Sequence, residues 1–223
     1  MGEPKRGRMR PLLLDLFCCQ GGAAAGYVAA GYDVVGVDLA PQPRYPFEFH
    51  QGDALEFLRE RGHEFAAIHS SPPCQKFTAY RRRDPSTVGA AALDLIDDTR
   101  QALRELGKPS VIENVEGAPL EASVVLCGSM FGLGVRRHRV FELHGFTMTQ
   151  PLCRHHEQRG SYPCATNRTN PRRTCEVGVY RIPLKTQQAA MGGCEWMDLG
   201  GLSQAIPPVY TEAIGRAMIE AVR

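Results

Sequence analysis

The chain has 223 residues, of which 43% are hydrophobic and 22% are charged, and its formal net charge is +2 at pH 7. This composition is typical of a soluble globular protein with a single core, and no apolar run reaches the ~18 to 20 residues of a membrane span. The net charge is too small to indicate a nucleic-acid partner by itself. However, 22 of the 26 cationic residues are arginines, with clusters at 81–83, 136–139 and 172–173. Arginine suits phosphates and base edges better than lysine does, although the base composition of a GC-rich genome would produce the same bias.

The first residues, Met1 to Arg8, form a basic tail without the apolar segment of a signal peptide. We therefore expect a cytoplasmic protein, in a bacterial cell or a phage-infected host. In that compartment the eight cysteines are expected to be thiols or metal ligands rather than disulfides.

A predicted ligand site is built from the first two strands. The apolar run Leu12–Phe17 leads through Gly21 and Gly22 into a helix-forming stretch, and a second strand, Val34–Asp38, ends in an acid. The glycines let a ligand approach the backbone, and the acid can accept hydrogen bonds from ribose hydroxyls. Because the turn lacks the G-x-G-x-x-G spacing of a dinucleotide site, a nucleoside without phosphates fits better, and S-adenosylmethionine is the common one.

Two later strands are followed by, or end in, residues with reactive side chains. The strand Phe65–His69 must stop at Pro72 and Pro73, which fix the backbone φ angle and withhold N–H groups, and Cys74 follows at once. The strand Ser110–Ile112 ends in Glu113. Since the ends of parallel strands meet at one edge of a sheet, a nucleophile and a carboxylate are predicted to face the same small substrate. The alternative is a buried structural cysteine.

Strands and helices alternate along most of the chain, which predicts an α/β fold with a mostly parallel sheet covered on both faces. The remaining predicted elements are a turn at Gln51–Ala54, helices over Leu55–Arg61, Val88–Leu106, Thr186–Met191 and Tyr210–Val222, and a strand over Arg139–Leu143. We assign 1–144 and 186–223 to one domain. The alternation is lost between 145 and 185, which is predicted to be a small irregular insertion.

These motifs, in this order, resemble those of the DNA (cytosine-5)-methyltransferases, and the resemblance covers about 180 of the 223 residues. The Pro-Cys-Gln and Glu-Asn-Val blocks are its most specific part. The matching blocks are Asp15-Leu16-Phe17 with Gly21-Gly22, Asp38, Gly52-Asp53, Pro73-Cys74-Gln75, Glu113-Asn114-Val115, Arg137-His138-Arg139-Val140-Phe141, and Gln204-Ala205-Ile206-Pro207-Pro208 with Glu212-Ala213-Ile214-Gly215.

The resemblance implies a Rossmann-like S-adenosylmethionine-dependent methyltransferase sheet and a set of site residues. Cys74 would add to C6 of a flipped cytosine and Glu113 would protonate N3, with Arg137 and Arg139 binding the base and flanking phosphate. The implied cofactor-binding residues are Phe17, Gly21, Gly22, Asp38, Leu39, Asp53, Ala54, Pro73, Gln204 and Ala205. The implied DNA-binding residues are Gln75, Arg81, Arg82 and Arg83, the last three of which could instead be a solvated charge run. For Glu113 to hold a proton at neutral pH, burial must raise its pKa.

The chain departs from the family pattern in its recognition region, which is reduced to about 145–185 and makes the protein resemble compact, phage-encoded members. This stretch contains Cys153, His155, His156, Cys164 and Cys175, which could bind zinc, although no C-x-x-C pair is present and unrelated surface residues are the alternative. Gln204 stands where the family usually has Asn, and Val135 where it usually has Gln.

Three hypotheses of function remain open from the sequence. The first is methylation of cytosine C5 in DNA with S-adenosylmethionine as methyl donor. The second keeps the covalent mechanism but takes RNA or a free cytosine nucleotide, or transfers another group. The third is a catalytically inactive DNA-binding protein, against which the intact Cys74 and Glu113 argue.

Overall fold

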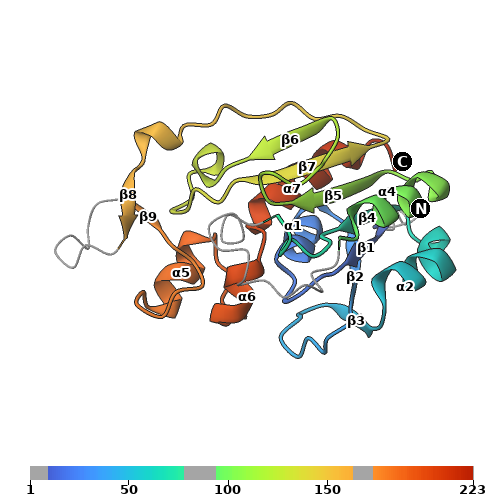
Figure 1. The fold of residues 1–223 in the computed structure, drawn as a ribbon, viewed down its shortest axis with the longest axis horizontal. Coiled ribbons are helices and arrows are strands. Elements are labelled where there is room, and N and C mark those ends of the chain that lie inside the picture. Colours follow the sequence, from blue (N-terminus) through green and yellow to red (C-terminus); the bar gives the residue numbers. More distant parts are fainter. Residues whose placement is uncertain (1–9, 78–93, 163–172, 223) are drawn as a thin grey trace, which may run out of the picture.

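The computed structural model describes residues 10–77, 94–162 and 173–222, built around one seven-stranded sheet (Figure 1). The strand order is β3-β2-β1-β4-β5-β7-β6. The strands are β1 (Leu12–Leu16), β2 (Asp33–Asp38), β3 (Glu48–Gln51), β4 (Ala67–Ser70), β5 (Ser110–Asn114), β6 (Ser123–Leu126) and β7 (Arg139–His144). Strands β1 to β5 pair in parallel, and β7 runs antiparallel between β5 and β6. The predicted α/β fold with a mostly parallel sheet is confirmed.

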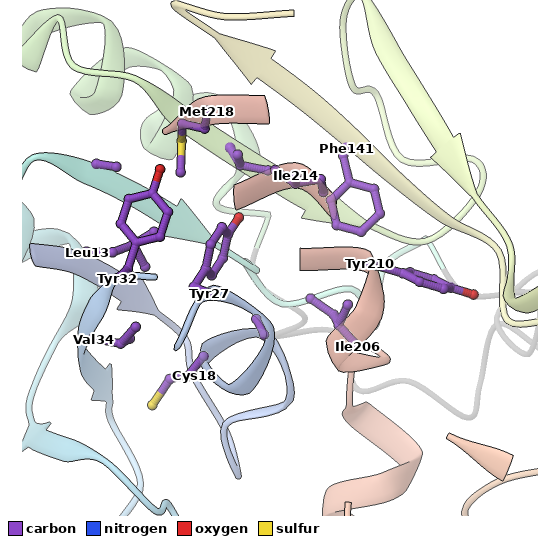
Figure 2. Close-up of a cluster of buried hydrophobic side chains, with 14 of the residues drawn as sticks. Leu13, Cys18, Tyr27, Tyr32, Val34, Phe141, Ile206, Tyr210, Ile214 and Met218 are labelled. Atoms are coloured by element: carbon purple, nitrogen blue, oxygen red, sulfur yellow. The ribbon is translucent and has the colours of Figure 1, made fainter. Parts of the chain in front are cut away.

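Helices cover both faces of the sheet. Successive residues of a strand point to opposite sides, so each central strand packs against helices on both faces. On one face, Leu13 and Val34 pack with α1 (Gly22–Ala30) and α7 (Pro208–Met218), whose side chains Figure 2 shows meeting in one cluster. On the other face, Leu14 and Val35 pack with α2 (Ala54–Arg61) and α4 (Ile96–Leu106).

The contact between α1 and α7 is close enough to require glycine. A Cβ added at Gly26 would lie 1.9 Å from the Pro208 carbonyl oxygen and 2.1 Å from Thr211 Oγ1. Thr211 is fully buried, and its hydroxyl donates to the Ala23 carbonyl at 2.8 Å. The last long helix is therefore fixed directly against the first one, which opens from the glycine-rich turn.

Several element boundaries differ from the sequence prediction. Helix α4 begins at Ile96, and positions 88–93 of the predicted helix lie outside the described residues. The predicted helices 186–191 and 210–222 are α5 (Leu184–Ala190) and α7, which ends at Met218. Strands β3 and β6 and helix α6 (Leu199–Gln204) were not predicted. The two strands lie at the sheet edges. Strand β3 is largely exposed and lacks the apolar pattern of a buried strand, whereas β6 is a short apolar run that ends in the fully buried Leu126.

The region from 145 to 185 contains little regular structure in its described part, as its composition indicates. It holds a 3-10 turn at His155–Glu157 and a parallel pair, β8 (Arg159–Tyr162) and β9 (Arg173–Cys175), which Figure 1 places at the opposite end of the molecule from α2. The domain boundaries at 144 and 186 stay predictions. Across the described ranges, no helix is both long and apolar enough to cross a membrane.

Candidate active site

One cavity of about 590 Å³ opens at the carboxyl ends of β1, β2, β4 and β5. Its walls are the turns that follow these strands, together with residues 203–206 at the end of α6 and just after it. Ligand sites of parallel sheets lie at this edge, and the volume is that of a small-molecule site. The predicted residues that line it are Phe17, Gly22, Asp38, Leu39, Asp53, Ala54, Pro73, Cys74, Gln75, Glu113, Arg139, Gln204 and Ala205.

Two acids organise the side of the cavity where the predicted cofactor-binding residues lie. Asp38 accepts hydrogen bonds from the backbone N–H groups of Cys19 at 2.9 Å and Ala40 at 3.0 Å, which fix its carboxylate at the end of β2. Asp53 caps α2 through one oxygen, Oδ1, which accepts from the N–H groups of Leu55 and Glu56, each at 2.9 Å. Both acids therefore hold the backbone around the cavity.

The turn after β1 adopts backbone conformations that are uncommon for its residue types. Phe17 has a φ of 58° and Cys19 a φ of 46°, and such left-handed residues cost about 1 kcal/mol or more each. Gly21, with a φ of 82°, precedes α1 and does not line the cavity. An added Cβ there would lie 3.0 Å from the Tyr45 ring, so Gly21 shapes the turn. The Cys19 thiol donates to Gln204 Oε1 at 3.2 Å and joins this turn to the last motif.

Asp15 is a cavity residue that the sequence analysis did not select as a site residue. Its side chain is 1% exposed in the middle of the sheet, and it forms no ion pair within the described ranges. Burial, and then the nearby charge of Asp38, raise the pKa of Asp15 to about 8. The available signal was a single carboxylate inside an otherwise apolar strand. A buried acid on a cavity wall suits a cationic group of a ligand.

Cys74 and Glu113 line the same cavity, which is the arrangement that the covalent mechanism requires. The loop that carries Cys74 is held by Asn114, whose side-chain amide donates to the Pro72 carbonyl at 3.0 Å. The Asn of the Glu-Asn-Val block thus ties the end of β5 to the Pro-Cys-Gln loop. Burial, and then the charge of Glu113, raise the pKa of Cys74, while Arg139 and Arg137 lower it, so burial outweighs the arginines.

Glu113 is 6% exposed and forms an ion pair with Arg139, Nε to Oε1 at 3.1 Å. Burial raises the pKa of Glu113, although Arg139 and a hydrogen bond with Ser71 oppose the shift. The direction is the one expected from the sequence for an acid that must carry a proton.

A buried hydrogen-bond chain extends from Glu113 into the core. The Ser71 hydroxyl, which is hydrogen-bonded to Glu113, lies 2.9 Å from His69 Nε2. The other ring nitrogen of His69, Nδ1, lies 3.0 Å from the Tyr27 hydroxyl. His69 is fully buried, and burial lowers its pKa to about 3, so the ring is neutral. Sequence reasoning missed this chain, although the signal was a histidine in an apolar strand.

Arg137 lies outside the cavity and holds its rim. Its Nε donates to the Ala205 carbonyl at 2.7 Å and its Nη2 donates to the Ser203 carbonyl at 2.6 Å. The guanidinium therefore fixes the end of α6 and the residue that follows it, and a role in binding base or phosphate stays a prediction. The predicted phosphate-binding residues Arg81, Arg82 and Arg83 lie outside the described residues.

A cluster of cysteine and histidine side chains lies around Cys153, apart from the cavity. The ligand atoms of Cys127, His138, Cys153 and His155 all lie within 4.8 Å of one another. Burial opposes ionisation of Cys153, but hydrogen bonds with both histidines and Ser129 lower its pKa to about 6. Two residues of the predicted zinc set, Cys153 and His155, belong to this group. The other described members, the exposed His156 and Cys175, do not belong to it, and Cys164 lies outside the described residues.

No protein-family model and no curated protein matches the sequence. Solved structures share its fold. The Dnmt2 methyltransferase of Schizosaccharomyces pombe has a TM-score of 0.64 at 12% identity, over 96% of this chain and 100% of that one. The Entamoeba histolytica methyltransferase EhMeth has a TM-score of 0.63 at 11% identity, over 97% and 100%. A proposed DNA modification methyltransferase from an Escherichia coli prophage matches 62% of this chain and 49% of its own, with a TM-score of 0.47 at 19% identity. The chain thus has the α/β fold of methyltransferases.

Proposed function

We propose that the protein is an S-adenosylmethionine-dependent DNA methyltransferase that acts on cytosine C5. The observation that carries the proposal is one cavity lined by Cys74, by the buried pair Glu113–Arg139 and by the acid Asp38. A nucleophile, a proton donor and a ribose-binding acid then face one space. The fold, which is that of methyltransferases, supports the same conclusion.

The residues of the cofactor half fit S-adenosylmethionine. Asp38 can accept hydrogen bonds from the ribose hydroxyls, and Leu39, an apolar side chain that is 74% exposed beside it, offers a surface for the adenine. Asp15 suits the cationic amino group. When bound, this cofactor supplies the methyl group as an electrophile.

The residues of the other half activate the base. Cytosine C5 is a poor nucleophile, and addition of the Cys74 thiolate to C6 turns the ring into an enamine. Glu113 gives its proton to N3 as the addition occurs, and Arg139 holds the Glu113 carboxyl in place. After the methyl group has joined C5, loss of the C5 proton to solvent would let the ring expel Cys74 as a thiolate, and return of the N3 proton to Glu113 would restore both the base and the acid.

The target cytosine must be flipped out of the duplex to enter the cavity, because its C6 is not accessible inside the base stack. Gln75, next to the nucleophile, is proposed to contact the nucleotide that is moved out. The arginines 81–83 are proposed to bind flanking phosphates.

Incubation with labelled S-adenosylmethionine and duplex DNA, tRNA or dCMP tests the substrate. We expect label at C5 of cytosine in DNA, and label confined to tRNA or dCMP would overturn the DNA assignment. An oligonucleotide containing 5-fluorocytosine, whose C5 fluorine cannot leave as a proton, should form a covalent adduct with the protein. Cys74→Ala should abolish the adduct, and Cys175→Ser, at a cysteine outside the cavity, should leave it unchanged. Absence of an adduct with the unaltered protein would favour an inactive DNA-binding protein.

A further inference from the structure

We propose that Cys127, His138, Cys153 and His155 bind one zinc ion, and that this ion fixes the segment carrying Arg137 and Arg139. The four ligand atoms lie within 4.8 Å of one another. Two thiolates and two imidazoles form a typical ligand set of a structural zinc site.

The sheet register brings the first two ligands together. Leu126, the last residue of β6, pairs with Arg139, the first residue of β7. Because the two strands are antiparallel, Cys127 and His138 are the next residues outward at the same end of the hairpin. They are separated by 10 residues in the sequence, which is why no short cysteine spacing marks the site.

The other two ligands come from the segment that leads into the region 145–185. Cys153 Sγ lies 2.9 Å from His155 Nδ1 and 3.7 Å from His138 Nε2. Around a tetrahedral zinc ion with bonds of about 2.0 to 2.3 Å, neighbouring ligand atoms are about 3.3 to 3.8 Å apart. Small side-chain adjustments therefore give the cluster the size of a zinc site.

Groups behind the ligands also fit a metal site. His138 turns Nε2 toward the thiols, and its Nδ1 lies 3.5 Å from Glu116 Oε2. A carboxylate behind a ligating histidine fixes the orientation of the ring. The Ser129 hydroxyl lies 3.2 Å from Cys127 Sγ and 3.6 Å from Cys153 Sγ, and it accepts from the Arg154 N–H at 3.1 Å. Cys127 is fully buried, while the other three ligands are partly exposed and leave a path of entry.

The position of His138 connects the metal to the active site, a consequence that rests on the proposed function. His138 separates Arg137, which holds the cavity rim, from Arg139, which pairs with Glu113. A bound ion would join this segment to β6 and to the 153–155 turn. Arg137 has a φ of 37°, and an outside constraint helps to maintain such a conformation.

The test is metal content by mass spectrometry, followed by X-ray absorption of the zinc-loaded protein. We expect one zinc per chain after dialysis against buffered zinc, with about two sulfur ligands near 2.3 Å and two nitrogen ligands near 2.0 Å. Cys153→Ser and His155→Ala should lose the tightly bound ion. The controls Cys175→Ser and His156→Ala, which change the same residue types outside the cluster, should keep it.

If a ligand variant does not fold, titration of the unaltered protein with Co²⁺ replaces it. The expected result is the intense visible absorption of tetrahedral cobalt with thiolate charge-transfer bands. Metal-free protein without cobalt absorption, retention of zinc in Cys153→Ser, or a site without sulfur ligands would each overturn the inference. These readouts do not depend on methyl transfer, so a zinc-loaded protein that methylates nothing would refute the proposed function and leave the zinc site standing.

Discussion

Removal of Arg139 should destabilise the protein in a way that depends on pH. Arg139 is the ion-pair partner of Glu113, Nε to Oε1 at 3.1 Å, and both side chains are largely buried, 15% and 8% exposed. In Arg139→Met the carboxylate would be left buried without its cation, and breaking such pairs costs about 3 to 5 kcal/mol.

Glu113 can limit this loss by taking up a proton. Its ordinary pKa is 4.5. At pH 7, protonation of such a group costs about 1.4 kcal/mol for each of roughly 2.5 pH units, or about 3.4 kcal/mol, which bounds the electrostatic part of the loss. When the pKa of a group is higher in the folded than in the unfolded protein, the group costs no stability at pH values below its unfolded-state pKa. The cost grows as the pH rises toward the folded-state pKa.

Urea denaturation at pH 5 and pH 7.5 measures the effect. We expect Arg139→Met to lose about 2 to 3 kcal/mol of unfolding free energy at pH 7.5, and less than about 1 kcal/mol of its electrostatic part at pH 5. In the double variant, Glu113→Gln should restore most of the loss. The control Arg104→Met breaks an exposed pair with Glu121 and should cost less than about 1 kcal/mol at both pH values. An equal loss for Arg139→Met at the two pH values would refute the reasoning.

Three further changes test other parts of the structure. Gly26→Ala should lower the free energy of unfolding by more than about 3 kcal/mol, because the added Cβ would meet the Pro208 carbonyl. Gly52→Ala, where nothing lies within 4 Å, should be tolerated. Similar losses in both variants would contradict the packing. Asn114→Ala should cost about 1 to 3 kcal/mol and lower kcat, since the Pro72 carbonyl loses its donor; unchanged kcat would exclude a role in holding the Cys74 loop. Asp15→Asn should gain stability relative to the unaltered protein as pH rises from about 4 to 8, because the raised pKa of Asp15 makes its ionisation costly. A pH-independent difference would show that Asp15 is not desolvated.

The parts of the site that follow strand ends were predictable from the sequence. Asp38 and Glu113 each come directly after a short apolar run, Cys74 follows another such run and its proline stop, and the geometry of a parallel sheet brings such ends together. The sequence does not reveal contacts with distant partners. The guanidinium of Arg137, which is predicted to bind the substrate, also donates to backbone carbonyls more than 60 residues away.

The Cys/His cluster shows the same limit. Sequence spacing directed attention to cysteines and histidines within 153–175, but two of the three partners of Cys153, Cys127 and His138, lie next to the ends of β6 and β7. Only the pairing register of β7 with the edge strand β6 reveals these two partners. His69 and Asp15 were visible as polar residues in apolar strands, yet their environment could be assigned only after the strands were placed.

The position of α7 against α1 has a consequence for synthesis of the chain. During translation, α1 and the loop that carries Cys74 leave the ribosome long before residues 203–218, which complete both the cavity and the apolar layer. Nascent chains would therefore expose the α1 face until residues 203–218 have been synthesised, and would need protection from aggregation in that interval. The same arrangement suggests a split protein: a fragment ending near 183 should remain inactive until a separate peptide spanning 184–222 is supplied in trans.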